Sequence, residues 1–355
     1  MDPLTQGALG AALPQAFASR RQVVTAGLLG FLSGMAPDLD VLIRSAADPL
    51  MFLEYHRQFT HALIFIPFGG LICALVLHGL IGRRGGLLFW QSYLFCVLGY
   101  ATHGLLDACT TYGTLLLWPF SDQRFAWNTI SIIDPLFTLP VLALIGYAAL
   151  RRRPALARAA VVWVLVYQGL GVWQREQAEA YGWTLAAQRG HEPLRLEAKP
   201  SFANILVWKV VYETQTHFHV DAVRTWPSKV AYPGESIPRL DVSRDMPWLV
   251  GESQQRRDIE RFRWFSNGYV ALDPQVPGRI IDVRYSMLPN EINSLWSIEV
   301  RPQAAVDDHV GYTMHRSGGR EQAGVLWRML RGEALSSGAP HTDLRSGAEY
   351  GVGGD

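Results

Sequence analysis

The chain has 355 residues, of which 49% are hydrophobic and 18% charged, and its formal net charge is +1. This balanced charge gives no reason to expect a nucleic-acid partner. The three cysteines, Cys73, Cys96 and Cys109, lie in or beside apolar segments, so no disulfide framework is predicted. We expect no secretory signal peptide, because the chain opens on Met-Asp-Pro rather than on a basic segment.

Apolar runs dominate up to about Trp173, and charged, mixed sequence follows. This change predicts a membrane region over residues 1–175 and a soluble domain after it. The first apolar run is short and contains Pro14, which favours a re-entrant or tilted segment over a full span. We predict an all-α polytopic membrane bundle of five or six helices, at residues 4–18, 23–35, 62–81, 87–108, 135–150 and 159–173.

Arginines occupy the turns at one end of the predicted bundle, at Arg20, Arg21, Arg83, Arg84, Arg151, Arg152, Arg153 and Arg158. The positive-inside rule places such turns in the cytoplasm. The histidines and acids described below fall at the opposite helix ends. We therefore expect them on the extracytoplasmic side of a bacterial inner membrane, together with the soluble domain.

Four polar clusters lie at those helix ends. Imidazole and carboxylate side chains suit zinc, and also manganese or iron, and this number of ligands would allow one or two ions. The sequence therefore predicts a divalent metal site, most simply zinc. The residues are Asp38 and Asp40 after Pro37, His56 and His61 before the third helix, His103 and Asp107 one turn apart on the fourth, and Asp134 before the fifth.

Each cluster also has a structural alternative. A D-x-D turn often caps a helix, and His103 with Asp107 could be a buried hydrogen-bonded pair at a helix end. Independent caps have no reason to share one membrane face, so the conjunction favours a metal site. For Arg57 and Arg124 two interpretations stay open: holding a phosphate or carboxylate, or snorkelling to the membrane surface.

After His103 and Asp107 the run Thr110-Thr111-Tyr112-Gly113 ends the helix, and Trp118-Pro119-Phe120 is typical of an interfacial aromatic anchor. From about residue 176 to 316 we predict a small β-rich or α+β domain. Its expected strands are residues 204–212, 217–226, 261–272, 279–285 and 295–300, with His217 and His219 in a surface or sheet role. Residues 317–355 are predicted to be mostly flexible, with a short helix at 323–330 and a disordered end over the last fifteen residues.

Three of these stretches resemble a known family. They are Pro-Asp-Leu-Asp ending at Asp40, His-Arg-Gln-Phe-Thr-His from His56 to His61, and the run from Gly99 through His103 and Asp107 to Trp-Pro-Phe. They look like the YdjM-like, LexA-regulated family of inner-membrane-associated metal-dependent hydrolases, over roughly residues 1–150. The opening Met-Asp-Pro-Leu-Thr-Gln is also similar, although some members have a histidine where this chain has Gln6. The resemblance implies a divalent metal, hydrolase activity and no ligand role for Gln6.

We therefore expect a membrane-bound metal-dependent hydrolase whose ligands are Asp38, Asp40, His56, His61, His103 and Asp107. Asp134 would be a further ligand, an orienting group or a general base, and Arg57 and Arg124 would hold a head group. We expect the protein to contact membrane lipids, and we expect its substrate to be an amphiphilic lipid or a lipid-linked ester or phosphoester. The alternative is a metal-binding transporter or scaffold without enzyme activity, although transporters place polar residues near the bilayer midplane.

Overall fold

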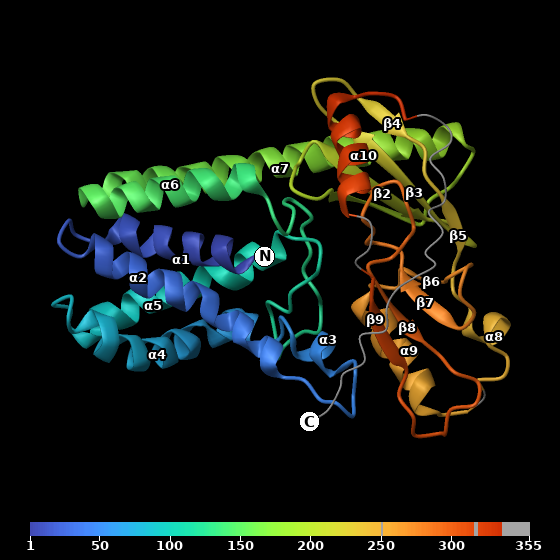
Figure 1. The fold of residues 1–355 in the computed structure, drawn as a ribbon, viewed down its shortest axis with the longest axis horizontal. Helices are drawn as coiled ribbons and strands as arrows, with labels where there is room; N and C mark the ends of the chain where they lie inside the picture. Colours follow the sequence, from blue (N-terminus) through green and yellow to red (C-terminus); the bar gives the residue numbers. More distant parts are fainter. Residues whose placement is uncertain (250, 316–318, 336–355) are drawn as a thin grey trace.

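The computed structural model describes residues 1–249, 251–315 and 319–335. A helical N-terminal half is followed by a β-rich C-terminal lobe (Figure 1). The helical half consists of α1 (Pro3–Phe17), α2 (Val23–Met35), η1 (Ala36–Leu42), α3 (Met51–Tyr55), η2 (Phe59–His61), η3 (Leu63–Phe65), α4 (Ile66–Leu77), η4 (His78–Gly82), α5 (Phe89–Ala108), α6 (Pro135–Arg151) and α7 (Pro154–Gln188).

The helix α1 lies inside the bundle, and most of its residues are buried. It begins where the Asp2 side chain caps the backbone N–H of Thr5, and Pro3 takes the first turn. Glycines let it approach α2 closely, because a Cβ on Gly30 would lie 2.2 Å from the Gly10 oxygen. Small residues at helix contacts are typical of membrane bundles.

Two helical segments are long and apolar enough to cross a membrane by length and composition, Leu63–Gly82 and Pro154–Gln188, and Pro135–Arg151 is a shorter apolar helix. Large apolar side chains on α4, α6 and α7 are exposed, among them Leu75, Leu139 and Leu165. A continuous exposed apolar surface of this kind is suited to lipid. The predicted number of five or six membrane helices stays a prediction.

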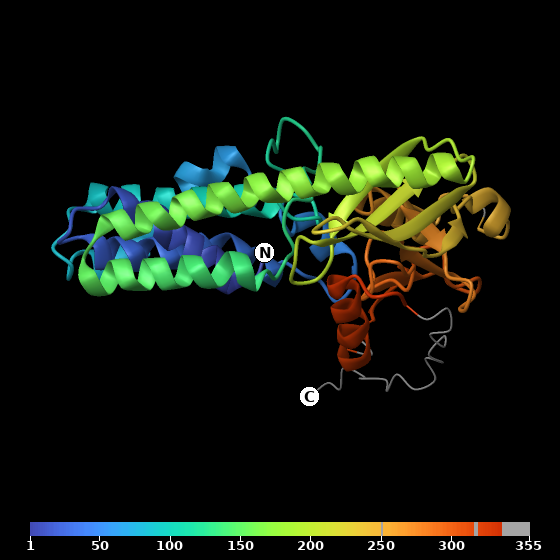
Figure 2. The same cartoon turned by 90° about the horizontal axis from the view of Figure 1, so that it is seen from above.

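The helix α7 is longer than the predicted segment 159–173. It continues to Gln188 and runs from the bundle into the lobe alongside β2 and β3 (Figures 1 and 2). The apolar pattern ends at Trp173, but the helix continues because Ala178 and Gly182 pack against the lobe, and Ala186 beyond them is buried. The predicted boundary at residue 175 therefore falls within an unbroken helix.

The lobe contains two antiparallel sheets. One has the order β1-β2-β3-β4, with β5 also paired to β3, and the other has the order β6-β7-β8-β9. The strands are β1 (Arg195–Pro200), β2 (Val207–Glu213), β3 (His217–Arg224), β4 (Val230–Tyr232), β5 (Ser236–Pro238), β6 (Val270–Leu272), β7 (Arg279–Asp282), β8 (Trp296–Glu299) and β9 (Gly311–Met314), with helices α8 (Val242–Asp245), α9 (Gln254–Phe265) and α10 (Gly319–Arg331).

Four of the predicted strands correspond to β2, β3, β7 and β8. The prediction for 261–272 is wrong over its first half, where α9 ends at Phe265 and only β6 is a strand. Ser253 caps α9, and Ile259, Phe262 and Phe265 are buried at a helical spacing. The abundance of aromatic residues in this stretch had favoured a strand, but the three-residue spacing of these buried side chains is that of a helix face. His219 lies in β3 and stacks on Tyr212 in β2, in agreement with a sheet role.

The short helix α3 belongs to the helical half in sequence but packs into the core of the lobe. Leu50 and Leu53 are buried among Ile259, Phe262 and other residues of the lobe. Arg261 of α9 holds the same segment through ion pairs with Asp48 and Glu54. The lobe therefore fixes the stretch that leads into the His56–His61 motif.

The predicted flexible tail begins with an ordered helix, because Leu326 and Met329 of α10 pack against the first sheet. The helix extends beyond the predicted segment 323–330 at both ends. The predicted disorder of the last fifteen residues lies outside the described residues.

Candidate metal centre

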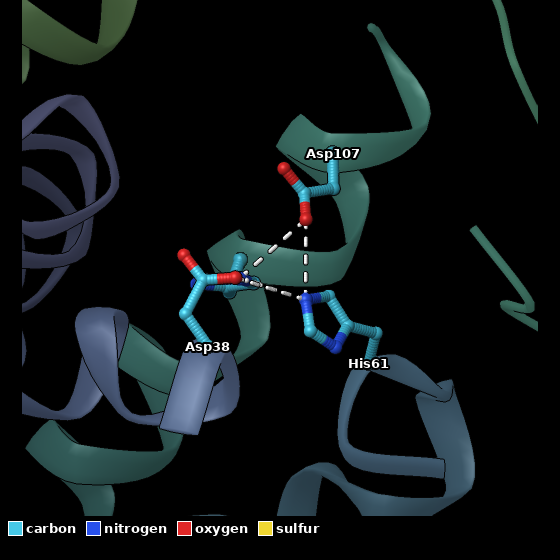
Figure 3. Close-up of side chains that lie close together, drawn as sticks. Asp38, His61 and Asp107 are labelled. Atoms are coloured by element: carbon cyan, nitrogen blue, oxygen red, sulfur yellow. Dashed lines mark hydrogen bonds and ion pairs between the residues drawn. The ribbon is translucent and has the colours of Figure 1, made fainter. Parts of the chain in front are cut away.

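The sequence motifs converge at the end of the bundle that faces the lobe. Asp38 and Asp40 lie on η1, which follows α2, and His56 and His61 lie at the end of α3 and in η2. His103 and Asp107 lie in the last two turns of α5. Figure 3 shows Asp38, His61 and Asp107 pointing toward one another from these three parts of the chain.

Two glycines allow this convergence. A Cβ on Gly104, directly after His103, would lie 2.3 Å from the His61 carbonyl oxygen, so only glycine lets the His61 backbone reach α5 here. Gly34 lies against Gly10 and Gly99, and its carbonyl oxygen is 2.6 Å from His103 Nδ1. The end of α2 therefore holds the His103 ring in position.

Four ligand atoms, from Asp38, His61, His103 and Asp107, lie within 4.8 Å of one another. The separations that involve a histidine nitrogen run from 2.9 Å between the two Nε2 atoms to 3.6 Å between His61 Nε2 and Asp38 Oδ1. The Asp107 Oδ2 atom is 3.1 Å from His61 Nε2 and 3.5 Å from His103 Nε2. Ligands about 2.0–2.1 Å from a tetrahedral zinc are about 3.3–3.4 Å apart, so the spacing fits such an ion.

The hydrogen bonds of the two rings indicate why the cluster suits a cation. A carbonyl only accepts, so His103 Nδ1 carries a proton toward Gly34 and neutral His103 has its lone pair on Nε2. His61 Nδ1 faces Asp40 Oδ2 at 3.3 Å, which favours the same tautomer. Two lone pairs 2.9 Å apart repel unless a proton or a metal ion lies between them.

Asp40 lies next to this cluster and is not one of its four ligands. Its oxygens accept hydrogen bonds from His56 Nδ1 at 2.7 Å, the Arg57 backbone N–H at 3.0 Å and Thr60 Oγ1 at 2.8 Å. It also faces His61, so it orients both histidines of the motif. Asp38, Asp40 and His56 form a second group whose ligand atoms lie within 4.8 Å of one another, so Asp38 belongs to both groups.

The carboxylates of the cluster are negatively charged and close together, so a positive charge between them is stabilising. Burial alone would lower the pKa of His61, but the carboxylates of Asp107, Asp38 and Asp40 raise it to about 10. Burial alone would raise the pKa of Asp38, but hydrogen bonds with His103 and His61 hold it well below its usual value. Without a metal the proton on His61 therefore supplies the positive charge.

The two candidate arginines have different surroundings. Arg57 is buried, its Nε lies 3.0 Å from Asp107 Oδ2, and its Nη1 donates to Thr110. The Arg124 guanidinium lies over the rings of Tyr112, Trp264 and Phe265, and its Nη2 donates to two backbone oxygens. Its Nε and Nη1 are buried and have no hydrogen-bond partner among the described residues, so two donors of a charged group are left unsatisfied.

Asp134 is not brought to the cluster by any contact within the described residues. Its Oδ1 caps α6 by accepting from the backbone N–H groups of Leu136 and Phe137, and its Oδ2 accepts from Tyr167 at 2.8 Å. One oxygen therefore caps α6, as the position before Pro135 indicates, and the other joins this cap to α7.

The sequence prediction missed four groups that position the ligands: Gln6, the Met1 amino group, Thr60 and Gly34. Gln6 Nε2 donates to Asp107 Oδ1 at 2.9 Å, and the same oxygen accepts from the amino group of Met1. Gln6 therefore lies at the site without being one of the cluster's ligands. Thr60 lies within the His56–His61 motif, and Gly34 lies three residues before Pro37. Their closeness to the motifs in sequence could have indicated that they position the ligands.

A cavity of about 780 Å³ lies between α3 and α9, and none of the four cluster residues lines it. Tyr55 and Gln58 on one wall flank His56 and Arg57 in the chain, and Arg256, Arg257 and Trp264 line the other wall. Trp264 also stacks on Arg124. The cavity is therefore lined both by the segment that contains His56 and Arg57 and by the lobe.

These features define a membrane protein whose bundle end gathers histidines and carboxylates that could hold a divalent metal. A model of the YdjM inner membrane protein family matches residues 1–178, so the chain belongs to this family and the resemblance seen in the sequence is confirmed. Comparison with curated proteins and with solved structures found no match.

Proposed function

We propose that this protein is a membrane-bound metal-dependent hydrolase that acts on a lipid or lipid-linked ester or phosphoester at the membrane surface. The observation that carries the proposal is the convergence of two imidazole Nε2 atoms and two carboxylate oxygens on one point. Asp38, His61, His103 and Asp107 would hold the ion, most simply zinc, with manganese or iron as alternatives. When bound, the ion would supply a Lewis acid and lower the pKa of water.

The chain's own residues have distinct roles in this proposal. Asp40 orients His61, and Arg57 offsets the charge of Asp107. The Asp38 side chain, 20% exposed, is the ligand that solvent reaches most easily, whereas His61, His103 and Asp107 are fully buried. The unsatisfied donors of Arg124 would suit a phosphate or carboxylate of the substrate, provided that the rings covering them move to admit it. Asp134 already has partners for both oxygens, so the proposal does not depend on it.

The side of the membrane is also part of the proposal. The arginine turns that follow α1, η4 and α6 lie at the end of the bundle remote from the lobe (Figure 1). Cytoplasmic turns of membrane proteins are rich in arginine, so the cluster and the lobe would lie on the extracytoplasmic side. A site there meets lipid head groups, which favours an amphiphilic substrate.

The rival function is a metal-binding transporter or scaffold. Transporters gather their ligands near the bilayer midplane, at broken helices. Here the ligands lie at the ends of α2 and α5, away from the middle of these helices, and this arrangement favours an enzyme.

The first test is whether the purified protein contains a divalent metal. Elemental analysis of the purified protein should find a divalent metal in the wild type and much less in Asp38→Ala and His103→Ala. His78→Gln, a histidine at the opposite end of the bundle, is the matched control and should retain the metal. A metal-free wild type, or unchanged metal in both ligand variants, would contradict the proposed site.

Substrate screening then separates a hydrolase from a carrier. Vesicles that contain phospholipids or polyprenyl phosphates are incubated with wild type, His61→Ala and His78→Gln, and released head group or phosphate is measured. Product from wild type and His78→Gln but not from His61→Ala supports the hydrolase. Metal that is bound without any product from this panel favours the carrier.

A further inference from the structure

We propose that the lobe itself contacts the lipid bilayer, through the β1–β2 loop at residues 201–206 and the neighbouring Trp226. The side chains that would enter the head-group region are Phe202 and Trp226. This inference concerns the outside of the molecule and does not depend on the hydrolase proposal.

The level of the membrane boundary can be read from α6 and α7. The run of closely spaced exposed apolar side chains on α7 ends at Trp173, ten residues before the exposed Trp183, and Arg175 follows Trp173 and donates to the Trp127 oxygen. In front of α6, Ile132 and Ile133 are exposed beside the exposed Leu136. Residues 127–133 therefore lie where the lipid-facing surface gives way to water.

The β1–β2 loop lies against this boundary. The Ala203 backbone N–H donates to Ser131 Oγ at 3.1 Å, and Lys199 Nζ reaches Asn128 Oδ1 at 3.4 Å. On the other side of the loop, the Thr225 N–H donates to the Leu206 oxygen at 2.9 Å, which brings Trp226 to the same end of the sheet.

The loop has a fixed shape that presents an aromatic side chain outward. Asn204 accepts from the N–H groups of Leu206 and Val207 and donates to Ser201 and to the Phe202 oxygen. Phe202 is nevertheless 59% exposed, and Trp226 is 54% exposed. The segment Ser-Phe-Ala-Asn-Ile-Leu contains no charged residue that would oppose entry into the head-group region.

A lipid surface is the partner that these observations favour. The hydrogen bond between Ala203 and Ser131 holds the loop with Phe202 near the exposed Ile132 and Ile133, and Phe120 and Trp127 are also exposed. Aromatic side chains with a polar backbone nearby are typical of the membrane–water interface. A soluble partner would have to bind a patch that borders the lipid directly.

Spin labels test the contact. Phe202→Cys is made in a background in which Cys73, Cys96 and Cys109 are serine, labelled, and reconstituted into phosphatidylethanolamine–phosphatidylglycerol vesicles. The control is Leu194→Cys, an exposed apolar position at the opposite end of β1, about 20 Å away along the strand. Collision rates with oxygen, which concentrates in lipid, and with a water-soluble nickel chelate are then compared.

We expect the label at 202 to have a several-fold higher ratio of oxygen to nickel collisions than the label at 194. Trp226→Cys is an independent second position and should behave like 202, so misfolding of one variant does not leave the question open. Equal ratios at 202, 226 and 194 would overturn the proposal. A low nickel collision rate at 202 that persists in detergent-free lipid nanodiscs but shows no oxygen excess would indicate a protein partner and also overturn it.

Discussion

Replacing Asp40 by asparagine separates an orienting group from a metal ligand. Asp40 Oδ2 receives Arg57 N–H, Thr60 and His61, whereas Oδ1 receives only His56. An asparagine would keep its oxygen on the crowded side and turn its NH₂ toward His56. The variant therefore forces His56 to accept at Nδ1 instead of donating, and it removes the negative charge that supports His61, while the four-atom cluster keeps its ligands.

Loss of such an outer group typically weakens metal binding about 10- to 100-fold, or about 1.4–2.7 kcal/mol. We expect this range for Asp40→Asn in a competition titration of the metal-free protein against a chelating dye. His103→Ala should lose far more, because it removes a ligand. Asp221→Asn, a buried carboxylate of the lobe that pairs with Arg189, is the control and should bind metal as the wild type does.

Two outcomes would refute this reasoning. Complete loss of metal in Asp40→Asn, equal to that in His103→Ala, would mean that Asp40 is itself a ligand, as the second group with Asp38 and His56 allows. Unchanged affinity would mean that the carboxylate does not control the histidines at all.

Three further predictions concern stability. Gly30→Ala should lower the free energy of unfolding in detergent by about 1–3 kcal/mol, because its Cβ would meet the Gly10 oxygen at 2.2 Å, whereas Gly146→Ala, with open space, should gain up to about 1 kcal/mol. Arg261→Met leaves the buried Asp258 without its guanidinium and should cost about 2–4 kcal/mol, with faster proteolysis at residues 43–50. Burial lowers the pKa of Lys209 to about 7, so the unfolded state binds the extra proton between about pH 7 and pH 10. The free energy of unfolding should therefore rise by about 1.4 kcal/mol per pH unit there, and this contribution should vanish in Lys209→Met.

Each of these has a clear contrary result. Equal melting temperatures for the two alanine variants would show that the α1–α2 contact tolerates a methyl group. Unchanged proteolysis of Arg261→Met would show that α3 is held by its leucines alone. Parallel pH profiles of wild type and Lys209→Met would show that Lys209 is charged in the folded lobe.

The helical half and the site motifs were predictable because each follows a local rule. Val23–Met35 is an apolar run that ends before a proline, and the structure gives these bounds to α2. His103 and Asp107 are one turn apart, so any helix places them on one side. Their meeting with Asp38 and His61 was inferred only from the side of the membrane, and the glycines that permit it, Gly34 and Gly104, act through contacts far apart in sequence.

The remaining differences arise from tertiary packing. Asp134 was grouped with the acids by its membrane side, but its neighbours in space, Tyr167 and the start of α6, give it a capping role. The aromatic residues of α9 suggested a strand, and their helical spacing became clear only through the core that they share with Leu53. The continuation of α7 to Gln188 depends on its contacts with the lobe, which polar sequence after Trp173 does not reveal.

Because Leu50 and Leu53 are buried in the C-terminal lobe, the position of His56 and His61 depends on that lobe. The match to the family model ends at residue 178. The two leucines nevertheless pack against apolar residues beyond it, such as Ile259 and Phe262. The segment that delivers His56 and His61 is thus folded by sequence outside the family region. Relatives without a comparable extension must anchor this segment by other means, and grafting the lobe from another member would require its leucine pocket to be grafted as well.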